Sequence, residues 1–236
     1  MKYRHLLVTG GCGFIGSNFI RFMLDSDKGI RITNIDKLTY AGNKNSLKDI
    51  EKNKRYKFSR GDISNEAHLK KLNWNAFDAV VHFAAESHVD ASIENPLVFI
   101  KTNVDGTAAL LEFARKFKTK KFVFISTDEV YGSIKKGFFS ESSKMNPSSA
   151  YSASKASADI LCQAFIVTYK MPIVIHRGCN NYGPYQFPEK VIPLFITNLM
   201  KNKKIPLYSK GENIRDWIYV LDNCKAIKLL LEKGKN

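Results

Sequence analysis

The sequence contains no uninterrupted apolar stretch near the roughly 20 residues that a membrane-spanning helix requires. Its first residues, Met1 to Arg4, lead directly into a short strand pattern and lack the apolar segment of a signal peptide. These absences argue against a membrane partner, and we expect a cytoplasmic protein.

Cysteine is also scarce, and its spacing indicates no special chemistry. None of the four cysteines forms a C-x-x-C motif, so the sequence indicates neither a zinc site nor a disulfide framework. No internal repeat is visible either. We expect no bound metal, and we expect buried free thiols at Cys12, Cys162, Cys179 and Cys224.

Acidic residues are too few to balance the basic ones, and the net charge is +15. Lysine-rich surfaces bind nucleic acids by releasing counterions, which makes a nucleic-acid partner one interpretation. The lysines are spread along the whole chain, so we favour a solvated basic surface and no nucleic-acid partner. A positive potential would also suit a substrate that carries a pyrophosphate.

Short strand-like apolar segments alternate with helical patterns along most of the chain. The 236 residues, 44% of them hydrophobic, are enough for one substantial core. The alternation predicts an α/β fold with a Rossmann-like, doubly wound parallel sheet. We expect strands at residues 5–9, 30–35, 57–60, 79–84, 121–126 and 172–176, and helices at residues 13–24, 65–72, 96–117, 150–169 and 188–202.

Beyond residue 181 this alternation loosens. Residues 205–209 and 214–220 resemble two short extended pieces around a turn, and a helix through residue 231 follows them. The pattern indicates part of a small second lobe.

A glycine-rich segment follows the first predicted strand. Gly10, Gly13 and Gly16 stand where the next helix opens, so that bare backbone can approach a pyrophosphate at a helix N-terminus. Asp36 ends the next strand, where an acid can hydrogen-bond the adenosine ribose and repel the extra phosphate of NADP. Lys37 keeps NADP open as an alternative, because its charge would neutralise that phosphate. We expect NAD.

A second group of residues indicates proton transfer. Tyr151 and Lys155 are four residues apart in a predicted helix, so the phenol and the ammonium lie on one face. A nearby cation favours the ionised phenol, so the spacing predicts a tyrosinate base with a lowered pKa. Asp128 and Glu129 follow the apolar strand at residues 122–125 and add a candidate acid and base. Together these groups would move protons on two neighbouring carbons.

Several segments share the motifs of a known family. Beside the glycine-rich turn, they are residues 36–43, 61–63, 84–90, 126–132, 151–155 and 180–184. These segments resemble the extended short-chain dehydrogenase/reductase family, also called the NAD-dependent epimerase/dehydratase family, and within it the dTDP-glucose 4,6-dehydratases. The triplet of Thr127, Asp128 and Glu129 is the most specific element of the resemblance, because related epimerases and decarboxylases usually lack the acid pair.

The resemblance implies a lyase that converts dTDP-glucose to dTDP-4-keto-6-deoxyglucose. The steps would be transient NAD reduction at C4, elimination of water across C5 and C6, and hydride return to C6. Tyr151, assisted by Lys155 and Thr127, would deprotonate the 4-hydroxyl. Glu129 would remove the C5 proton while Asp128 protonates the departing C6 hydroxyl.

Binding residues carry over from the same resemblance. Arg215 is the preferred diphosphate ligand, because guanidinium offers paired donors to phosphate oxygens; a surface salt bridge is its alternative. The NAD-binding residues would include the three glycines, the Tyr-Lys pair, Phe14, Ile15, Asp36, Lys37, Leu38, Thr39, Asp62, Ile63, Phe83, Ala84, Ala85, Ser87, Thr102 and Asn181. The substrate would contact Ser87, Thr127, Asn180, Lys190, Pro206, Tyr208 and Arg215.

The resemblance also implies an incomplete substrate lobe, since family members run on for roughly a third more chain. We expect a NAD-binding Rossmann domain at residues 1–181 and a partial nucleotide-sugar-binding lobe at residues 182–236. A homodimer would form through the helices at residues 99–117 and 150–169.

Three functions remain open from the sequence. Beside the dTDP-glucose dehydratase, they are a related NAD-dependent sugar-nucleotide epimerase or UDP-glucose dehydratase, and a non-catalytic NAD-binding remnant. His82 and His88 are further acid-base candidates, but we expect His82 to be a strand residue with satisfied hydrogen bonds, and neither has the partner spacing of a metal ligand.

Overall fold

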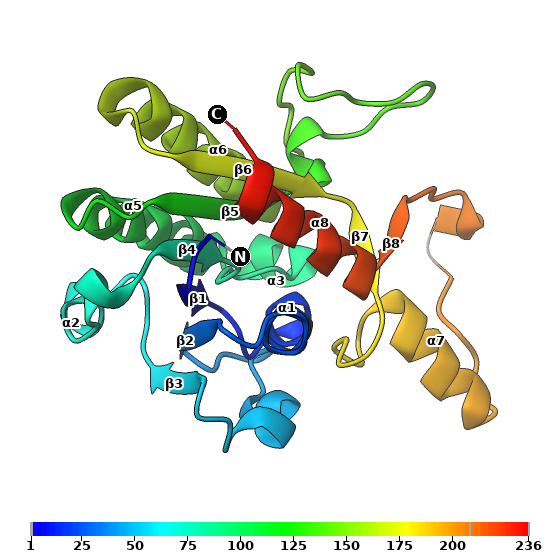
Figure 1. Ribbon diagram of the computed structural model, residues 1–236. Helices are drawn as coiled ribbons and strands as arrows, with labels where there is room; N and C mark the ends of the chain where they lie inside the picture. Colours follow the sequence, from blue (N-terminus) through cyan, green and yellow to red (C-terminus); the bar gives the residue numbers. More distant parts are fainter. Residues whose placement is uncertain (1, 208, 236) are drawn as a thin grey trace.

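A computed structural model describes residues 2–207 and 209–235 of the chain (Figure 1). Its six-stranded sheet is parallel throughout, with the order β3-β2-β1-β4-β5-β6, which confirms the predicted α/β fold. The order reverses between β1 and β4, and open α/β sheets bind ligands beyond the carboxyl ends of strands at such a point. The strands are β1 (His5–Thr9), β2 (Arg31–Asp36), β3 (Tyr56–Arg60), β4 (Ala79–His82), β5 (Lys121–Thr127) and β6 (Ile173–Gly178).

Helices cover both faces of this sheet. The α-helices are α1 (Phe14–Ser26), α2 (Glu66–Lys70), α3 (Val89–Glu94), α4 (Pro96–Phe99), α5 (Gly106–Lys116), α6 (Ala150–Tyr169), α7 (Val191–Met200) and α8 (Val220–Lys233). Shorter helical segments are η1 (Lys44–Ile50), η2 (Trp74–Ala76), η3 (Ile100–Asp105), η4 (Asp128–Tyr131) and η5 (Ser209–Gly211). None of the helices within the described ranges is long and apolar enough to cross a membrane.

Two hydrophobic cores lie on opposite faces of the sheet, because successive side chains of a strand point to opposite sides. Leu6 of β1 belongs to the core that α1 and α8 cover. Leu7, the next residue, belongs to the core beneath α5 and α6. This arrangement fixes the carboxyl ends of β1, β4 and β5 as one rigid edge (Figure 1).

Two sequence predictions about helices have different outcomes. Helix α6 spans Ala150–Tyr169 as predicted, and a capping box between Ser149 and Ser152 explains its start. The predicted helix at residues 96–117 is instead three consecutive segments, α4, the π-helical η3 and α5. Buried Asn103 of η3 explains the interruption, since its amide donates to the backbone oxygen of Glu86 at 3.0 Å and to Ser154 Oγ at 2.8 Å.

The segment after residue 181 also differs from the prediction. Residues 205–207 form no strand, and only β8 (Trp217–Tyr219) is extended in the second predicted piece; Tyr208 lies outside the described residues. Strand β8 pairs in parallel with β7 (Asn180–Tyr182) in a small second sheet. The domain boundary at residue 181 stays a prediction, and α8 packs on the large sheet beside α1 (Figure 1).

Candidate active site

The glycine turn after β1 is built for close backbone contact. Gly10 has φ +70, and its amide donates to the oxygen of Ile35 at 2.9 Å. A Cβ atom there would lie 2.5 Å from the nitrogen of Ala84, so glycine is required by both conformation and space. Gly13 precedes α1 without a capping side chain, which leaves the first amides of the helix available at its positive end.

Asp36 lies at the carboxyl end of β2, beside this turn. It is buried, and its two carboxylate oxygens accept hydrogen bonds of 2.8 Å from the amides of Cys12 and Leu38. Burial raises the pKa of Asp36, while these two hydrogen bonds oppose that rise. Each oxygen keeps a second lone pair, so the carboxylate can still accept from a ribose hydroxyl.

Lys37 forms an ion pair with Asp62, and its Nζ lies 2.8 Å from Oδ2. Burial alone would raise the pKa of Asp62, but the hydrogen bonds from Lys37 and Ser64 lower it below its usual range. The charge of Lys37, which kept NADP open as an alternative, is therefore already neutralised by the carboxylate of Asp62.

A cleft of about 1270 Å³, its open mouth included, runs along the carboxyl edge of the sheet. All predicted NAD-binding residues except Leu38 and Asn181 line it. Leu38 packs on a hydrophobic core instead, and Asn181 bonds to Asn223 and to the backbone of Cys179. Of the predicted substrate residues, Ser87 and Lys190 line the cleft; Thr127, Asn180, Pro206 and Arg215 do not, and Tyr208 lies outside the described residues.

The sequence analysis assigned no site role to eleven residues that also line the cleft: Ile35, Tyr40, Ala41, Gly42, Gly61, Glu86, Ile125, Ser126, Tyr185, Gln186 and Phe187. Tyr40 and Glu86 stand inside family motifs, so their position in the sequence was a usable signal. Tyr40 contacts the ring of Phe187 edge-on at 5.5 Å between centroids, which joins two loops across the cleft. Tyr185 and Gln186, which also line the cleft, lie on the same loop as Phe187.

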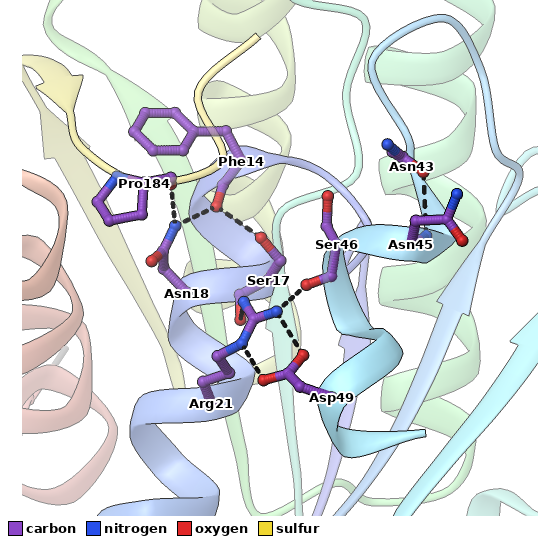
Figure 2. A network of polar contacts seen from close by, with 9 residues as sticks. All are labelled: Phe14, Ser17, Asn18, Arg21, Asn43, Asn45, Ser46, Asp49 and Pro184. Carbon is purple, nitrogen blue, oxygen red and sulfur yellow. Dashed lines mark hydrogen bonds and ion pairs between the residues drawn. The ribbon is translucent and has the colours of Figure 1, made fainter. Parts of the chain in front are cut away.

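That loop is held against α1 (Figure 2). Asn18 donates one hydrogen bond of 2.9 Å to the backbone oxygen of Pro184 and another to that of Phe14. Arg21 pairs with Asp49 at 2.7 Å, and its guanidinium carbon lies 4.1 Å from the centre of the Tyr185 ring. These contacts bring a late segment of the chain to the start of the predicted cofactor site.

The predicted Tyr-Lys pair lies in the buried first turns of α6. Lys155 Nζ donates to the backbone oxygen of Ile125 at 2.6 Å, and burial lowers the pKa of Lys155 to about 8. Burial raises the pKa of Tyr151, the Glu129 charge raises it further, and a hydrogen bond with the Thr127 hydroxyl opposes both effects. The predicted lowering of the phenol pKa is therefore wrong for the groups of this chain, because burial and the neighbouring carboxylates raise this pKa and the Thr127 hydroxyl opposes them only in part.

The acid pair lies in η4, directly after β5. The Thr127 hydroxyl accepts from the amide of Glu129 at 3.3 Å and donates to Oδ1 of Asp128 at 3.2 Å. Burial raises the pKa of both acids; the Asp128 charge adds to the rise at Glu129, and Arg215 and Lys190 oppose it. Raised carboxyl pKa values suit groups that must exchange protons near neutral pH.

The two histidines differ in their surroundings. His82 is buried between Thr9 and Thr107, with ring nitrogens 2.7 Å and 2.9 Å from the two hydroxyls, and burial lowers its pKa to about 3. It is therefore a neutral strand residue with satisfied hydrogen bonds, as predicted. Nε2 of His88 lies 3.3 Å from Oε1 of Glu189, and neither residue lines the cleft. No cluster of metal-ligating side chains occurs among residues 2–207 and 209–235.

The sequence and fold both have known relatives. The family model described as GDP-mannose 4,6 dehydratase matches residues 7–236. The chain is 47% identical over 234 residues to a dTDP-glucose 4,6-dehydratase of Streptomyces niveus, an alignment that covers 98% of this chain and 69% of the relative. The chain belongs to the dTDP-glucose 4,6-dehydratase family. The resemblance inferred from the motifs is thereby confirmed.

Solved structures of dTDP-glucose 4,6-dehydratases have the same fold. The enzyme from Bacillus anthracis, solved in complex with NAD, has a TM-score of 0.92 and 47% identity. The enzyme from Streptomyces venezuelae, solved with NAD and TYD bound, has a TM-score of 0.94 and 47% identity. Each match covers 98% of this chain and 73% of the solved one.

Proposed function

We propose that this chain carries the catalytic site of a nucleotide-sugar 4,6-dehydratase that acts on dTDP-glucose. One observation supports this most strongly: the Thr127 hydroxyl bonds to Asp128 Oδ1 at 3.2 Å and to the Glu129 amide at 3.3 Å, so it ties down a half-buried acid pair whose charges act on the Tyr151 phenol. Oxidation at C4 and loss of water across C5 and C6 need a base on one carbon and an acid-base pair on its neighbours. The site provides these groups side by side.

NAD fits the cleft on the geometry of this chain. A Cβ atom at Gly16 would lie 2.5 Å from the oxygen of Gly10, so glycine lets the start of α1 pack closely on the turn after β1, as a dinucleotide fingerprint requires. Asp36 would hold the adenosine ribose, and Phe14 and Ile15 would offer helix amides to the phosphates. When bound, NAD would accept a hydride and later return it, so that the reaction has no net redox change.

The chain's own groups would move the protons. Tyr151 would deprotonate the 4-hydroxyl, with Thr127 orienting the phenol, and Lys155 would supply positive charge beside it. The resulting 4-ketone would acidify the C5 hydrogen, which Glu129 would remove. Asp128 would protonate the C6 hydroxyl as it leaves as water. Arg215 and Lys190, whose charges reach Glu129, would bind the diphosphate.

The test is mass spectrometry of a mixture of dTDP-, UDP-, GDP- and CDP-glucose after incubation with the purified chain and NAD. We expect loss of one water from dTDP-glucose. Loss of water from UDP-glucose alone would replace the proposed nucleotide. Inversion at C4 without loss of water, read by NMR of the sugar, would indicate an epimerase. Four unchanged sugars, with NAD still bound, would indicate a non-catalytic binder.

A further inference from the structure

Arg177, at the carboxyl end of β6, uses its whole guanidinium group in a buried network. Nε and Nη2 donate to the two carboxylate oxygens of Asp159 at 2.8 Å and 2.9 Å. Nη1 donates to the Tyr131 hydroxyl at 2.8 Å and to the backbone oxygen of Glu141 at 3.3 Å. Asp159 is fully buried, so this paired geometry is shielded from water and holds both side chains in place.

The network connects the two halves of the proposed site. Asp159 follows Lys155 by four residues and Tyr151 by eight in α6, so all three lie along one helix face. Tyr131 is the last residue of η4, two positions after Glu129. Arg177 therefore bridges the helix that carries the Tyr-Lys pair and the turn that carries the acid pair.

Apolar packing and hydrogen bonds hold the turn η4 in different ways. Val130 and Tyr131 pack on Ala156 of α6, and the Tyr131 ring stacks on Phe139 at 5.2 Å. These apolar contacts fix the general position of the turn. Thr127 acts on the Tyr151 phenol of α6 at the start of the turn, whereas the end of the turn at Tyr131 needs a separate constraint. The hydrogen bond from Arg177 to Tyr131 orients the end of η4, because it constrains the position of the phenol oxygen of Tyr131.

We propose that Arg177 is a positioning residue that sets the distance between Tyr151 and the acid pair, acting through Asp159 on one side and Tyr131 on the other. The proposal rests on the proposed function, since it assigns Arg177 to the coupling of C4 oxidation with elimination at C5 and C6. A misplaced acid turn slows elimination, whereas binding of the nucleotide sugar and of NAD does not depend on it.

The decisive variant is Tyr131→Phe. It removes one hydrogen bond and keeps the ring packing and the Arg177–Asp159 pair, whereas Arg177→Met would leave the buried Asp159 charge unpaired and endanger folding. We expect kcat for dehydration to fall roughly tenfold or more with KM unchanged, because small displacements of catalytic groups cost large factors in rate. Tyr3→Phe, at a buried tyrosine in the core that α1 and α8 cover, is the matched control and should leave kcat unchanged.

A double-mutant cycle tests whether Arg177 acts through the acid pair. In a Glu129→Gln background, Tyr131→Phe should cause no further loss of kcat, since the group it positions is already absent. Full additivity of the two losses, or a rise in KM with kcat intact, would overturn the positioning role.

Hydrogen exchange provides a readout that needs no turnover. Tyr131→Phe should speed exchange of the amides at residues 129–132 severalfold, while the amides of α6 keep their protection. Unchanged exchange in the turn would overturn the proposal whatever the kinetics. If the wild-type chain dehydrates no sugar nucleotide, the proposed function fails, and the exchange experiment still decides whether the network holds the turn.

Discussion

The ammonium of Lys37 lies 2.8 Å from the carboxylate of Asp62, and both residues line the predicted cofactor cleft. Lys37 follows Asp36 directly in the sequence, and Asp62 follows β3, the neighbour of β2. The pair therefore removes from the site the cation that would otherwise favour a 2′-phosphate, and leaves Asp36 to determine the choice of dinucleotide.

Asp36→Asn should reduce the preference for NAD over NADP. The wild-type carboxylate repels the extra phosphate of NADP, and like charges in contact cost several kcal/mol, so the ratio of the two dissociation constants should fall at least roughly tenfold. Isothermal titration calorimetry with NAD and with NADP measures the two dissociation constants and so gives their ratio. Asp90→Asn, on α3, is a control of the same chemistry and should leave the ratio unchanged. An unchanged ratio in Asp36→Asn would show that Asp36 does not select the cofactor.

Lys155→Met should change how stability depends on pH. Burial lowers the pKa of Lys155 from 10.5 to about 8, so the unfolded chain binds more protons than the folded one between these values. Wild-type stability therefore gains with rising pH across this window, by up to about 3 kcal/mol, and the variant lacks that gain. Urea unfolding of both proteins at pH 7.5 and pH 10.5 measures the difference. Lys101→Met, at an exposed lysine of η3, is the control, and parallel pH curves for wild type and Lys155→Met would contradict the prediction.

The sequence predicted the sheet well because each strand and its following helix carry local signals. The start of α6 is an example, since Ser149 and Ser152 form a capping box in the turn that carries Tyr151. Pairing of β7 with β8 was not predictable in this way. Parallel strands that are far apart in sequence share no turn that would mark the pair.

The chemistry of the site was predicted less completely than its location. The spacing of Tyr151 and Lys155 gave the shared helix face, but burial, which dominates both pKa values, is a property of the packed molecule. The Arg177 network was missed for a related reason. Its members come from β6, α6 and η4, and only the fold brings them within hydrogen-bond distance.

Glu129→Gln should slow dehydration while raising stability. The substitution keeps the size of the side chain but removes the proposed C5 base, so we expect loss of water to fall at least about a hundredfold. Burial and the Asp128 charge raise the pKa of Glu129, so the ionised form is costly in the folded state, and a neutral amide avoids that cost near pH 7. Mass spectrometry of the sugar and the thermal midpoint measure the two effects.

Exposed Glu94, on α3, provides the control for this experiment. Glu94→Gln should change neither turnover nor the midpoint. If Glu129→Gln kept wild-type turnover, another group would have to remove the C5 proton. If it only lowered the midpoint, the carboxylate would be a structural group.

Leu97→Glu should convert a dimer to a monomer. The side chains of Ile93, Leu97, Ile160 and Val167 are 72%, 76%, 56% and 67% exposed, and they lie on α3, α4 and α6, which pack against one another. Exposed apolar surface of this extent favours a homodimer through α3, α4 and α6, of which α6 belongs to the interface predicted at residues 99–117 and 150–169. A buried unpaired carboxylate at its centre should raise the dimer dissociation constant at least about a hundredfold. Sedimentation equilibrium measures this constant, with Met200→Glu on α7 as the control for added charge at an exposed apolar position. A monomeric wild-type chain, or dissociation by the α7 variant alone, would place the interface elsewhere.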